Sequence, residues 1–139
     1  MKESLRLYPP AWALTRVALS ECTIGGYRVP AGASVTMSQW IVQRDPRYFG
    51  HPTGFDPDRW TDEFSDRLPR FAYFPFGGGP RVCVGASLAL MEAVLILATI
   101  AQRFRLALVP GHPVELWPTL VLQPRYGMKM VLEARCLEH

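Results

Sequence analysis

Hydrophobic and polar positions change their period several times along this chain, and each change predicts a different element. Residues 2–8 have the pattern of a short helix, which Pro9 and Pro10 end because proline disfavours helix in the residue before it. Between residues 14 and 38 apolar positions alternate with polar ones, and glycine-containing turns separate the runs. This stretch predicts a small antiparallel β-meander, with strands over 14–19, 22–24, 27–29 and 33–37. A helical turn is expected at 40–43.

The second half of the chain predicts a long loop followed by one long helix. Residues 45–82 have weak periodicity but many prolines and aromatics, which favours a long ordered loop over a flexible linker. Residues 86–104 are apolar enough for a core helix. They are shorter than the ~20 apolar residues that a bilayer needs and include Glu92, so no membrane segment is predicted. Strands are expected over 105–109, 120–122 and 128–132.

The first helix is too short to be stable alone. It has about two turns with no N-cap residue before it, so it is expected to begin upstream of residue 1. We therefore interpret residues 1–139 as a C-terminal fragment of a single domain, of α+β class.

Composition excludes several classes of protein. The 139 residues include thirteen prolines and eleven glycines, too many for a simple helical bundle. The net charge is only +3 and no Lys/Arg run is present, which argues against nucleic acid. Three widely spaced cysteines, Cys22, Cys83 and Cys136, argue against a disulfide scaffold and a zinc site. With no secretory signal at the start, a cytoplasmic location is expected.

The strongest chemical candidate is a cysteine that directly precedes the long helix. Glycines and a proline hold the backbone before Cys83, and unpaired N–H groups at a helix start favour a thiolate. Arg81 adds a nearby cation, and Gly85 would let a large flat group approach. Two interpretations stay open from these residues alone: an activated cysteine beside a large ligand, or an inert buried cysteine. A phosphate-binding loop is excluded because no Lys-Ser/Thr pair follows the glycines.

Three motifs in order resemble those of the cytochromes P450. The cysteine loop matches Phe-x-x-Gly-x-Arg-x-Cys-x-Gly at every fixed position: Phe76, Gly79, Arg81, Cys83 and Gly85. The family's Glu-x-x-Arg motif is present as Glu3 and Arg6, followed by Leu7-Tyr8-Pro9-Pro10. Its Pro-Glu-Arg-Phe motif is similar to Pro57-Asp58-Arg59-Trp60, with the arginine retained. The resemblance covers essentially the whole chain and implies a mainly helical P450-type fold.

The resemblance implies roles for these residues. Cys83 would be the axial thiolate ligand of the iron in haem b, with Phe76 packed beside it and Arg81 paired with a propionate. Arg16 matches a position that often reaches the other propionate. Glu3, Arg6 and Arg59 would form a buried structural charge cluster. Cys22 and Cys136 have no implied role.

The resemblance also implies a reaction for the parent protein. It would be a monooxygenase that inserts one oxygen atom from O2 into a small apolar substrate, with NAD(P)H electrons arriving through a ferredoxin- or flavodoxin-type donor. The family's distal helix with its acid/alcohol pair is absent from these residues, so the fragment alone is expected to be inactive. The alternatives are a peroxygenase or isomerase with the same loop, and a non-catalytic remnant that binds haem weakly or not at all.

Overall fold

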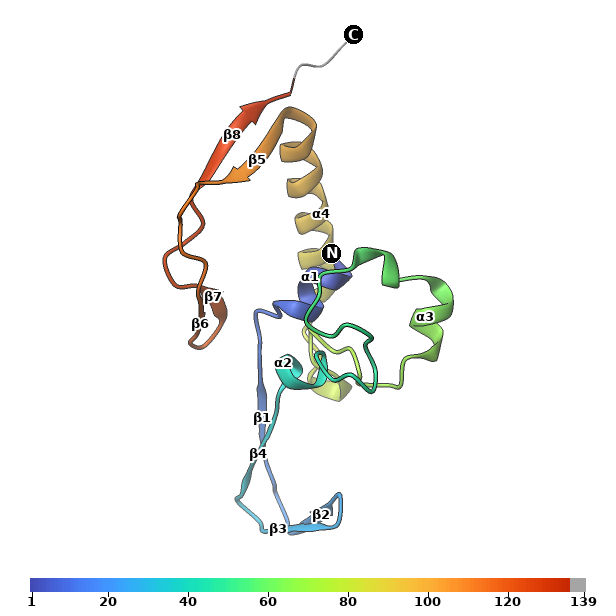
Figure 1. Ribbon diagram of the computed structural model, residues 1–139. Coiled ribbons are helices and arrows are strands. Elements are labelled where there is room, and N and C mark those ends of the chain that lie inside the picture. Colours follow the sequence, from blue (N-terminus) through green and yellow to red (C-terminus); the bar gives the residue numbers. More distant parts are fainter. Residues whose placement is uncertain (136–139) are drawn as a thin grey trace.

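The computed structural model describes residues 1–135, so Cys136 lies outside the described residues. Helix α1 (Lys2–Leu7) lies near the centre of the molecule, and the rest of the chain extends from it in three directions (Figure 1). It ends where the Tyr8 N–H donates to the Ser4 carbonyl at 2.7 Å. The following Pro9 has no N–H with which to continue the helix. The short helix predicted at the start of the chain is therefore present.

The predicted strands after α1 are present, but they pair in a nested order and not as a continuous meander. Strand β1 (Leu14–Val17) pairs antiparallel with β4 (Ser34–Met37), with Leu14 opposite Met37. Strands β2 (Cys22–Ile24) and β3 (Tyr27–Val29) form a separate hairpin at the far end of this ribbon (Figure 1). The Ala18 N–H donates to the Ala33 carbonyl at 2.9 Å, which extends the outer ladder past β1 and joins the first and fourth strands.

The long loop contains more regular structure than its weak periodicity predicts. Helix α2 (Gln39–Val42) precedes it, at the predicted helical turn. Within the loop lie the 3-10 helix η1 (Pro57–Arg59), the α-helix α3 (Asp62–Arg67) and the 3-10 helix η2 (Gly79–Arg81). Helix α3 was not predicted. It forms because the Thr61 hydroxyl accepts the Phe64 N–H at 3.1 Å and so caps the helix start.

The C-terminal part consists of one long helix and two ribbons. Helix α4 (Ala86–Arg103) matches the prediction and runs directly into β5 (Phe104–Leu108), which pairs antiparallel with β8 (Met130–Ala134). Strands β6 (Leu116–Pro118) and β7 (Leu122–Pro124) form a small hairpin. The strand predicted over 120–122 lies mostly on the turn of this hairpin. The Leu122 N–H donates to the Pro10 carbonyl at 2.8 Å, so the hairpin lies against the segment after α1.

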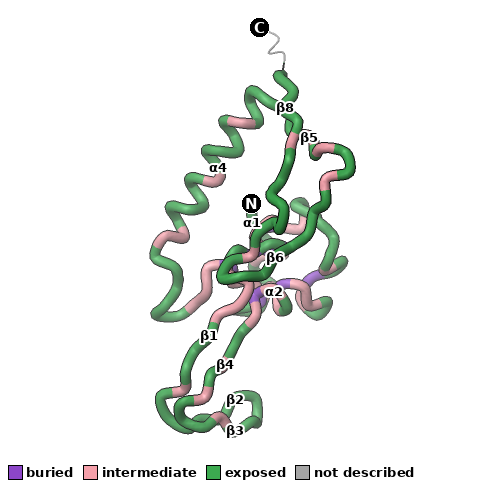
Figure 2. Tube along the Cα trace, turned by 90° about the vertical axis from the view of Figure 1, so that its left-hand side faces the viewer, coloured by how far each residue is buried: buried purple, intermediate pink, exposed green. Residues whose placement is uncertain are grey.

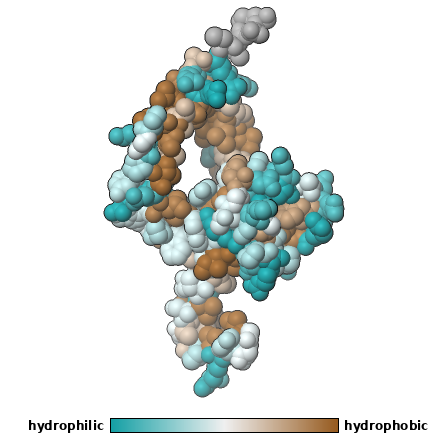
Figure 3. Space-filling model, viewed as in Figure 1, coloured by the Kyte–Doolittle hydropathy of each residue, from teal (hydrophilic) through white to brown (hydrophobic). Residues whose placement is uncertain are grey.

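Buried residues gather where α1, α2 and the long loop meet (Figure 2). Several of them are polar or charged: Glu3, Arg6, Gln39 and Gln43. Helix α4 has no buried residue among these 135, so the expected core helix is not covered within this chain. Apolar side chains lie over α4 and the β5–β8 ribbon (Figure 3). By length and composition alone α4 could cross a membrane, which is weak evidence because core helices of soluble proteins share these properties.

Candidate functional site

The cysteine loop is held by its own backbone. The Cys83 N–H donates to the Phe76 carbonyl at 3.0 Å, and the Val82 N–H donates to the Gly79 carbonyl at 3.1 Å within η2. The Cys83 carbonyl accepts the Ala86 N–H at 3.3 Å, at the first residue of α4. Cys83 therefore lies two residues before the helix N-cap, Gly85, and is exposed. The described residues therefore do not bury Cys83, and its role stays a prediction.

At two positions of this loop the backbone requires glycine. Gly79 has φ +71°, in the left-handed region that other residues rarely adopt. A Cβ on Gly78 would lie 2.4 Å from Cε1 of Phe71, so the ring packs directly on the backbone there. At Gly85 a Cβ would meet only the Cys83 sulfur, at 3.9 Å, which is ordinary contact. Close approach of a flat ligand at Gly85 therefore stays a prediction.

A cavity of about 440 Å³ lies beside this loop, between the β1–β4 ribbon and η2. Its walls are mostly apolar, and Arg16 on β1 and Gly79 on η2 both line it. The Arg16 guanidinium is exposed and donates to the neighbouring Thr15 carbonyl at 2.9 Å. The structure thus brings two predicted site residues, Arg16 and Gly79, to one cavity. Its lining suits an apolar group that carries negative charge, as haem does through its propionates. The remaining lining residues are Leu14, Met37, Val42, Phe71, Phe74 and Gly78.

Four further predicted site residues of this segment do not line the cavity: Phe76, Arg81, Cys83 and Gly85. Phe76 is half-buried and is tied to Cys83 through its carbonyl oxygen. Arg81 is exposed at the end of η2, two residues before the cysteine. The structure therefore places an exposed thiol and an exposed cation on one short loop, with the Arg16 cavity beside it.

Glu3 and Arg6 form a buried ion pair on one face of α1. The Arg6 Nη2 lies 2.7 Å from Glu3 Oε1, and its Nε donates to Oε2 at 2.9 Å. Both side chains are essentially excluded from water, at 1% and 0% exposure. Their spacing of three residues places them side by side on the helix. Geometry of this kind, with two parallel N–H donors, makes a strong and well-oriented pair.

Residues 56–60 of the long loop complete the surroundings of the Glu3 carboxylate. Arg59 Nε donates to Oε1 at 3.2 Å, the Asp56 N–H donates to the same oxygen at 3.0 Å, and Trp60 Nε1 donates to Oε2 at 2.9 Å. Burial alone would raise the pKa of Glu3, but the bonds from Arg6, Asp56 and Trp60 outweigh it and lower the pKa to about 2. The structure thus brings Glu3, Arg6 and Arg59 together around one carboxylate.

Several groups around this cluster were not predicted. Arg6 also donates to the carbonyl oxygens of Gln43, Pro52 and Gly54, at 2.6–2.9 Å. The sequence motif predicts Trp60 only as a replacement for phenylalanine. In the structure its indole N–H donates a hydrogen bond to Glu3. The sequence signal for this contact was the tryptophan itself, because its indole N–H can donate a hydrogen bond and a phenylalanine ring cannot. The three carbonyls carried no sequence signal because any residue supplies one.

Arg44 is a second, half-buried cation near Arg6. Its guanidinium lies 3.1 Å from the centre of the Trp40 ring and donates to the carbonyl oxygens of Leu7 and Trp40. Burial, with repulsion from Arg6, lowers the pKa of Arg44 to about 10. The carbonyl of Leu7, the last residue of α1, is thus satisfied by the Arg44 side chain.

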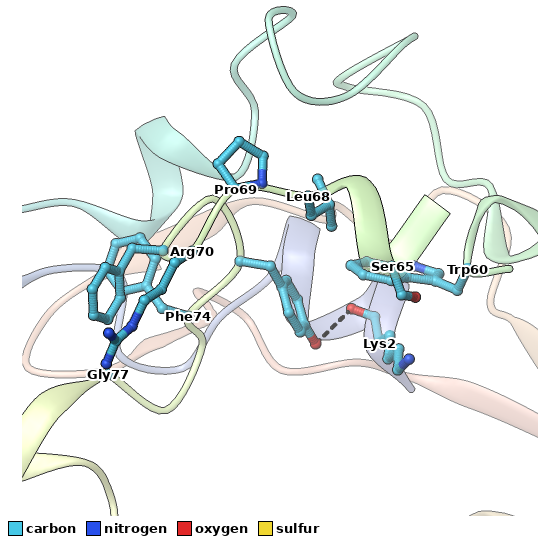
Figure 4. A pocket seen from close by; sticks show the side chains of 10 residues that line it. Lys2, Trp60, Ser65, Leu68, Pro69, Arg70, Phe74 and Gly77 are labelled. Carbon is cyan, nitrogen blue, oxygen red and sulfur yellow. Dashed lines mark hydrogen bonds between the residues drawn. The ribbon is translucent and has the colours of Figure 1, made fainter. Parts of the chain in front are cut away.

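A second cavity, of about 350 Å³, opens on the loop side of the molecule (Figure 4). Lys2 and Arg70 lie at its opposite ends, and Trp60 forms part of its wall. The Tyr73 hydroxyl donates to the Lys2 carbonyl at 3.2 Å, which joins the loop to α1. Burial, with the nearby charge of Glu3, raises the pKa of Tyr73 well above its usual range. This side of the molecule presents cations around aromatic surface.

Comparison with known proteins agrees with this geometry. Residues 1–131 match the family model described as cytochrome P450. Cyclooctatin synthase of Streptomyces melanosporofaciens is 42% identical over 133 residues, 96% of this chain and 29% of that protein. Cyclooctat-9-en-7-ol 5-monooxygenase of the same organism is 47% identical over 109 residues, 78% of this chain and 24% of that protein.

Solved structures agree in fold as well as sequence. The retinoic acid-bound cyanobacterial CYP120A1 superposes with a TM-score of 0.91 at 32% identity, over 96% of this chain and 31% of that structure. The chain spans less than a third of the length of these relatives. The family match over nearly all its residues is nevertheless decisive: this chain belongs to the cytochrome P450 family.

Proposed function

We propose that this chain supplies the thiolate side of the haem site in a monooxygenase, with Cys83 as the axial ligand of the haem b iron. The observation that carries the proposal is the exposed Cys83 thiol on a backbone-held loop beside the Arg16 cavity. Membership of the cytochrome P450 family supports haem as the group that this cavity receives. The likeness to a relative named as a monooxygenase supports oxygen insertion as the reaction, and a small apolar compound is proposed as the substrate.

Each residue of the site has a role that its position supports. Cys83 binds the iron, and the Phe76 carbonyl orients it through the Cys83 N–H. Arg16, in the cavity wall, pairs with one propionate, and Arg81, exposed on η2, pairs with the other. The half-buried Phe76 ring would pack beside the bound sulfur, as the family resemblance implies. When bound, the haem supplies the oxygen-activating chemistry, while the protein sets its ligand and surroundings.

Selective protection of one cysteine tests the proposal. Cys22 and Cys83 are both exposed, so both thiols should react with iodoacetamide in the absence of haem. In the whole protein, haemin should slow alkylation of Cys83 strongly and leave alkylation of Cys22, on the distant β2–β3 hairpin, unchanged. Equal protection of both cysteines, or of neither, would contradict Cys83 as the ligand.

Electrons are proposed to arrive from NAD(P)H through an acidic ferredoxin or flavodoxin that binds the loop side. Arg70 and Arg81 are exposed there, and Arg67 is partly compensated by Glu63 at 3.9 Å. Exposed charges of one sign accelerate the approach of an opposite partner, in a salt-dependent way. Reduction rates should fall with ionic strength and on Arg70→Glu, but change little on Arg28→Glu, on the distant β2–β3 hairpin. A rate indifferent to salt and to Arg70→Glu would show that these arginines are only solvated charges and do not bind the donor.

A further inference from the structure

The first residue of α2, Gln39, and its C-cap, Gln43, are equally buried but differ completely in their hydrogen bonds. Gln39 and Gln43 are both 0% exposed. Within the described residues, neither the Nε2 nor the Oε1 of Gln39 has a hydrogen-bond partner. The amide of Gln43 makes three hydrogen bonds, all to backbone groups of other segments. The two residues therefore offer a matched pair, in which only one amide joins parts of the fold.

The Nε2 of Gln43 satisfies the end of α1. It donates to the carbonyl oxygens of Leu5 and Arg6, both at 3.0 Å. These carbonyls belong to the last turn of the helix, where no partner exists within the helix itself. The backbone carbonyl of Gln43 in turn accepts Arg6 Nη1 at 2.8 Å. Gln43 is thus joined to the Glu3–Arg6 helix through its side chain and its backbone.

The Oε1 of Gln43 binds the segment that leads to the cysteine. It accepts the Phe74 N–H at 3.0 Å. The Phe74 carbonyl accepts the Gly77 N–H at 2.9 Å, which closes a turn around Phe76. The Phe76 carbonyl then accepts the Cys83 N–H at 3.0 Å. A continuous series of hydrogen bonds and short backbone links therefore runs from α1 through the Gln43 amide to Cys83.

We propose that Gln43 is a positioning residue for the cysteine loop, fixing the Phe74–Gly77 backbone, and through it Cys83, relative to α1. An uncharged amide suits this position because it donates and accepts at once. A leucine would leave the Phe74 N–H and two carbonyls without partners in a buried site. The effect on iron ligation rests on the proposed function of Cys83, whereas the effect on the loop backbone does not.

Amide hydrogen exchange in the whole protein separates positioning from general stability. In Gln43→Leu, exchange at the Phe74 and Cys83 N–H groups should rise about tenfold, as expected for loss of one buried hydrogen bond. Amides of the β5–β8 ribbon, remote from Gln43, should keep their wild-type rates. Gln39→Leu should change neither group, because that amide holds nothing among the described residues.

Iron ligation gives a second readout. In the haem-loaded protein reduced under carbon monoxide, Gln43→Leu should lose a measurable fraction of the thiolate Soret band, and Gln39→Leu should keep it. If Gln43→Leu does not fold, Gln43→His replaces it, since neutral imidazole supplies one donor and one acceptor. Protection of the Cys83 N–H from hydrogen exchange in this variant should approach the wild-type value at high pH. It should fall at lower pH, where the imidazole is protonated and no longer accepts a hydrogen bond.

The outcomes distinguish this inference from the proposed function. A uniform rise in exchange across the protein, or an unchanged Cys83 N–H in both Gln43 variants, would overturn the positioning role. A wild-type protein without a thiolate band would instead refute Cys83 as the iron ligand. The exchange comparison between Gln43 and Gln39 would still decide whether Gln43 fixes the loop.

Discussion

At the residue scale, the arrangement depends most on Glu3, a buried carboxylate shared by two arginines and two further N–H donors. Its pairing with Arg6 was predictable because a spacing of three residues fixes neighbours on a helix. The contact of Arg59 with the same carboxylate was predictable only from the family resemblance, since 52 residues of mostly irregular chain lie between Arg6 and Arg59. Local periodicity carries no information about such a contact.

Acid should weaken the fold through Glu3. The pKa of this carboxyl is about 2 in the folded protein against an ordinary 4.5, so the unfolded chain takes up the proton first. The resulting stabilisation is complete above about pH 4.5 and disappears as the pH falls towards 2. The shift corresponds to roughly 3 kcal/mol. Urea unfolding from about pH 6 to about pH 2 should show this loss in wild type and a flatter dependence in Glu3→Gln.

Removal of Arg59 should cost more than removal of an exposed arginine. Arg59 is only 7% exposed and donates to Glu3 and to the Gly50 carbonyl at 2.7 Å. Arg59→Leu leaves part of a buried carboxylate uncompensated, so the free energy of unfolding should fall by roughly 3–5 kcal/mol. Arg28→Leu, which breaks an exposed pair with Glu21, should cost less than about 1 kcal/mol. Normal haem content and stability in Arg59→Leu would refute a structural role for the cluster.

At the scale of elements, prediction succeeded where periodicity was strong and failed where a local contact decided the structure. Helix α4 follows from its apolar composition and the turn before it, and its observed end lies within one residue of the predicted one. Helix α3 was missed because six residues are too few for a visible period. Its signal was the cap: Thr61 followed by two acidic residues in the first turn. The nested pairing of β1 with β4 also depends on tertiary contact, which strand patterns alone do not specify.

The cap predicts a matched pair of substitutions in α3. Thr61→Ala removes the acceptor of the Phe64 N–H and should lower the free energy of unfolding by about 1 kcal/mol. The Ser65 hydroxyl donates to the Thr61 carbonyl, which also accepts the Ser65 N–H at 3.0 Å. Ser65→Ala therefore leaves that carbonyl satisfied and should change stability by less than half as much. Equal effects in thermal unfolding would show that the cap does not hold α3.

At the scale of the whole molecule, apolar surface is distributed very unevenly. Leu95, Ile96 and Leu97 on α4 are all more than half exposed, as is Leu132 on β8. Exposed apolar surface of this extent marks an interaction face. The chain also spans less than a third of the length of its relatives. We infer that residues outside these 139 cover α4. The sequence predicted an apolar helix, but no pattern within it specifies which partner covers it.

Residues 1–139 expressed alone should therefore behave as an incomplete fold. We expect binding of the dye ANS, association at micromolar concentration, weak haemin uptake and no NAD(P)H-coupled product with any electron donor. Replacing Leu95 and Leu97 by lysine should reduce ANS binding and association without restoring activity. Stoichiometric haem with coupled hydroxylation by the isolated chain would show that it needs no further cover.

The central claim is that Cys83 binds the haem iron, and the carbon monoxide spectrum of the reduced whole protein tests it most directly. Wild type should show the red-shifted Soret band that is characteristic of thiolate ligation. Cys83→His should bind haem with a nitrogen ligand and lose this shift, while Cys22→Ser, on the β2–β3 hairpin, should keep it. A red-shifted band that persists unchanged in Cys83→His would contradict the account.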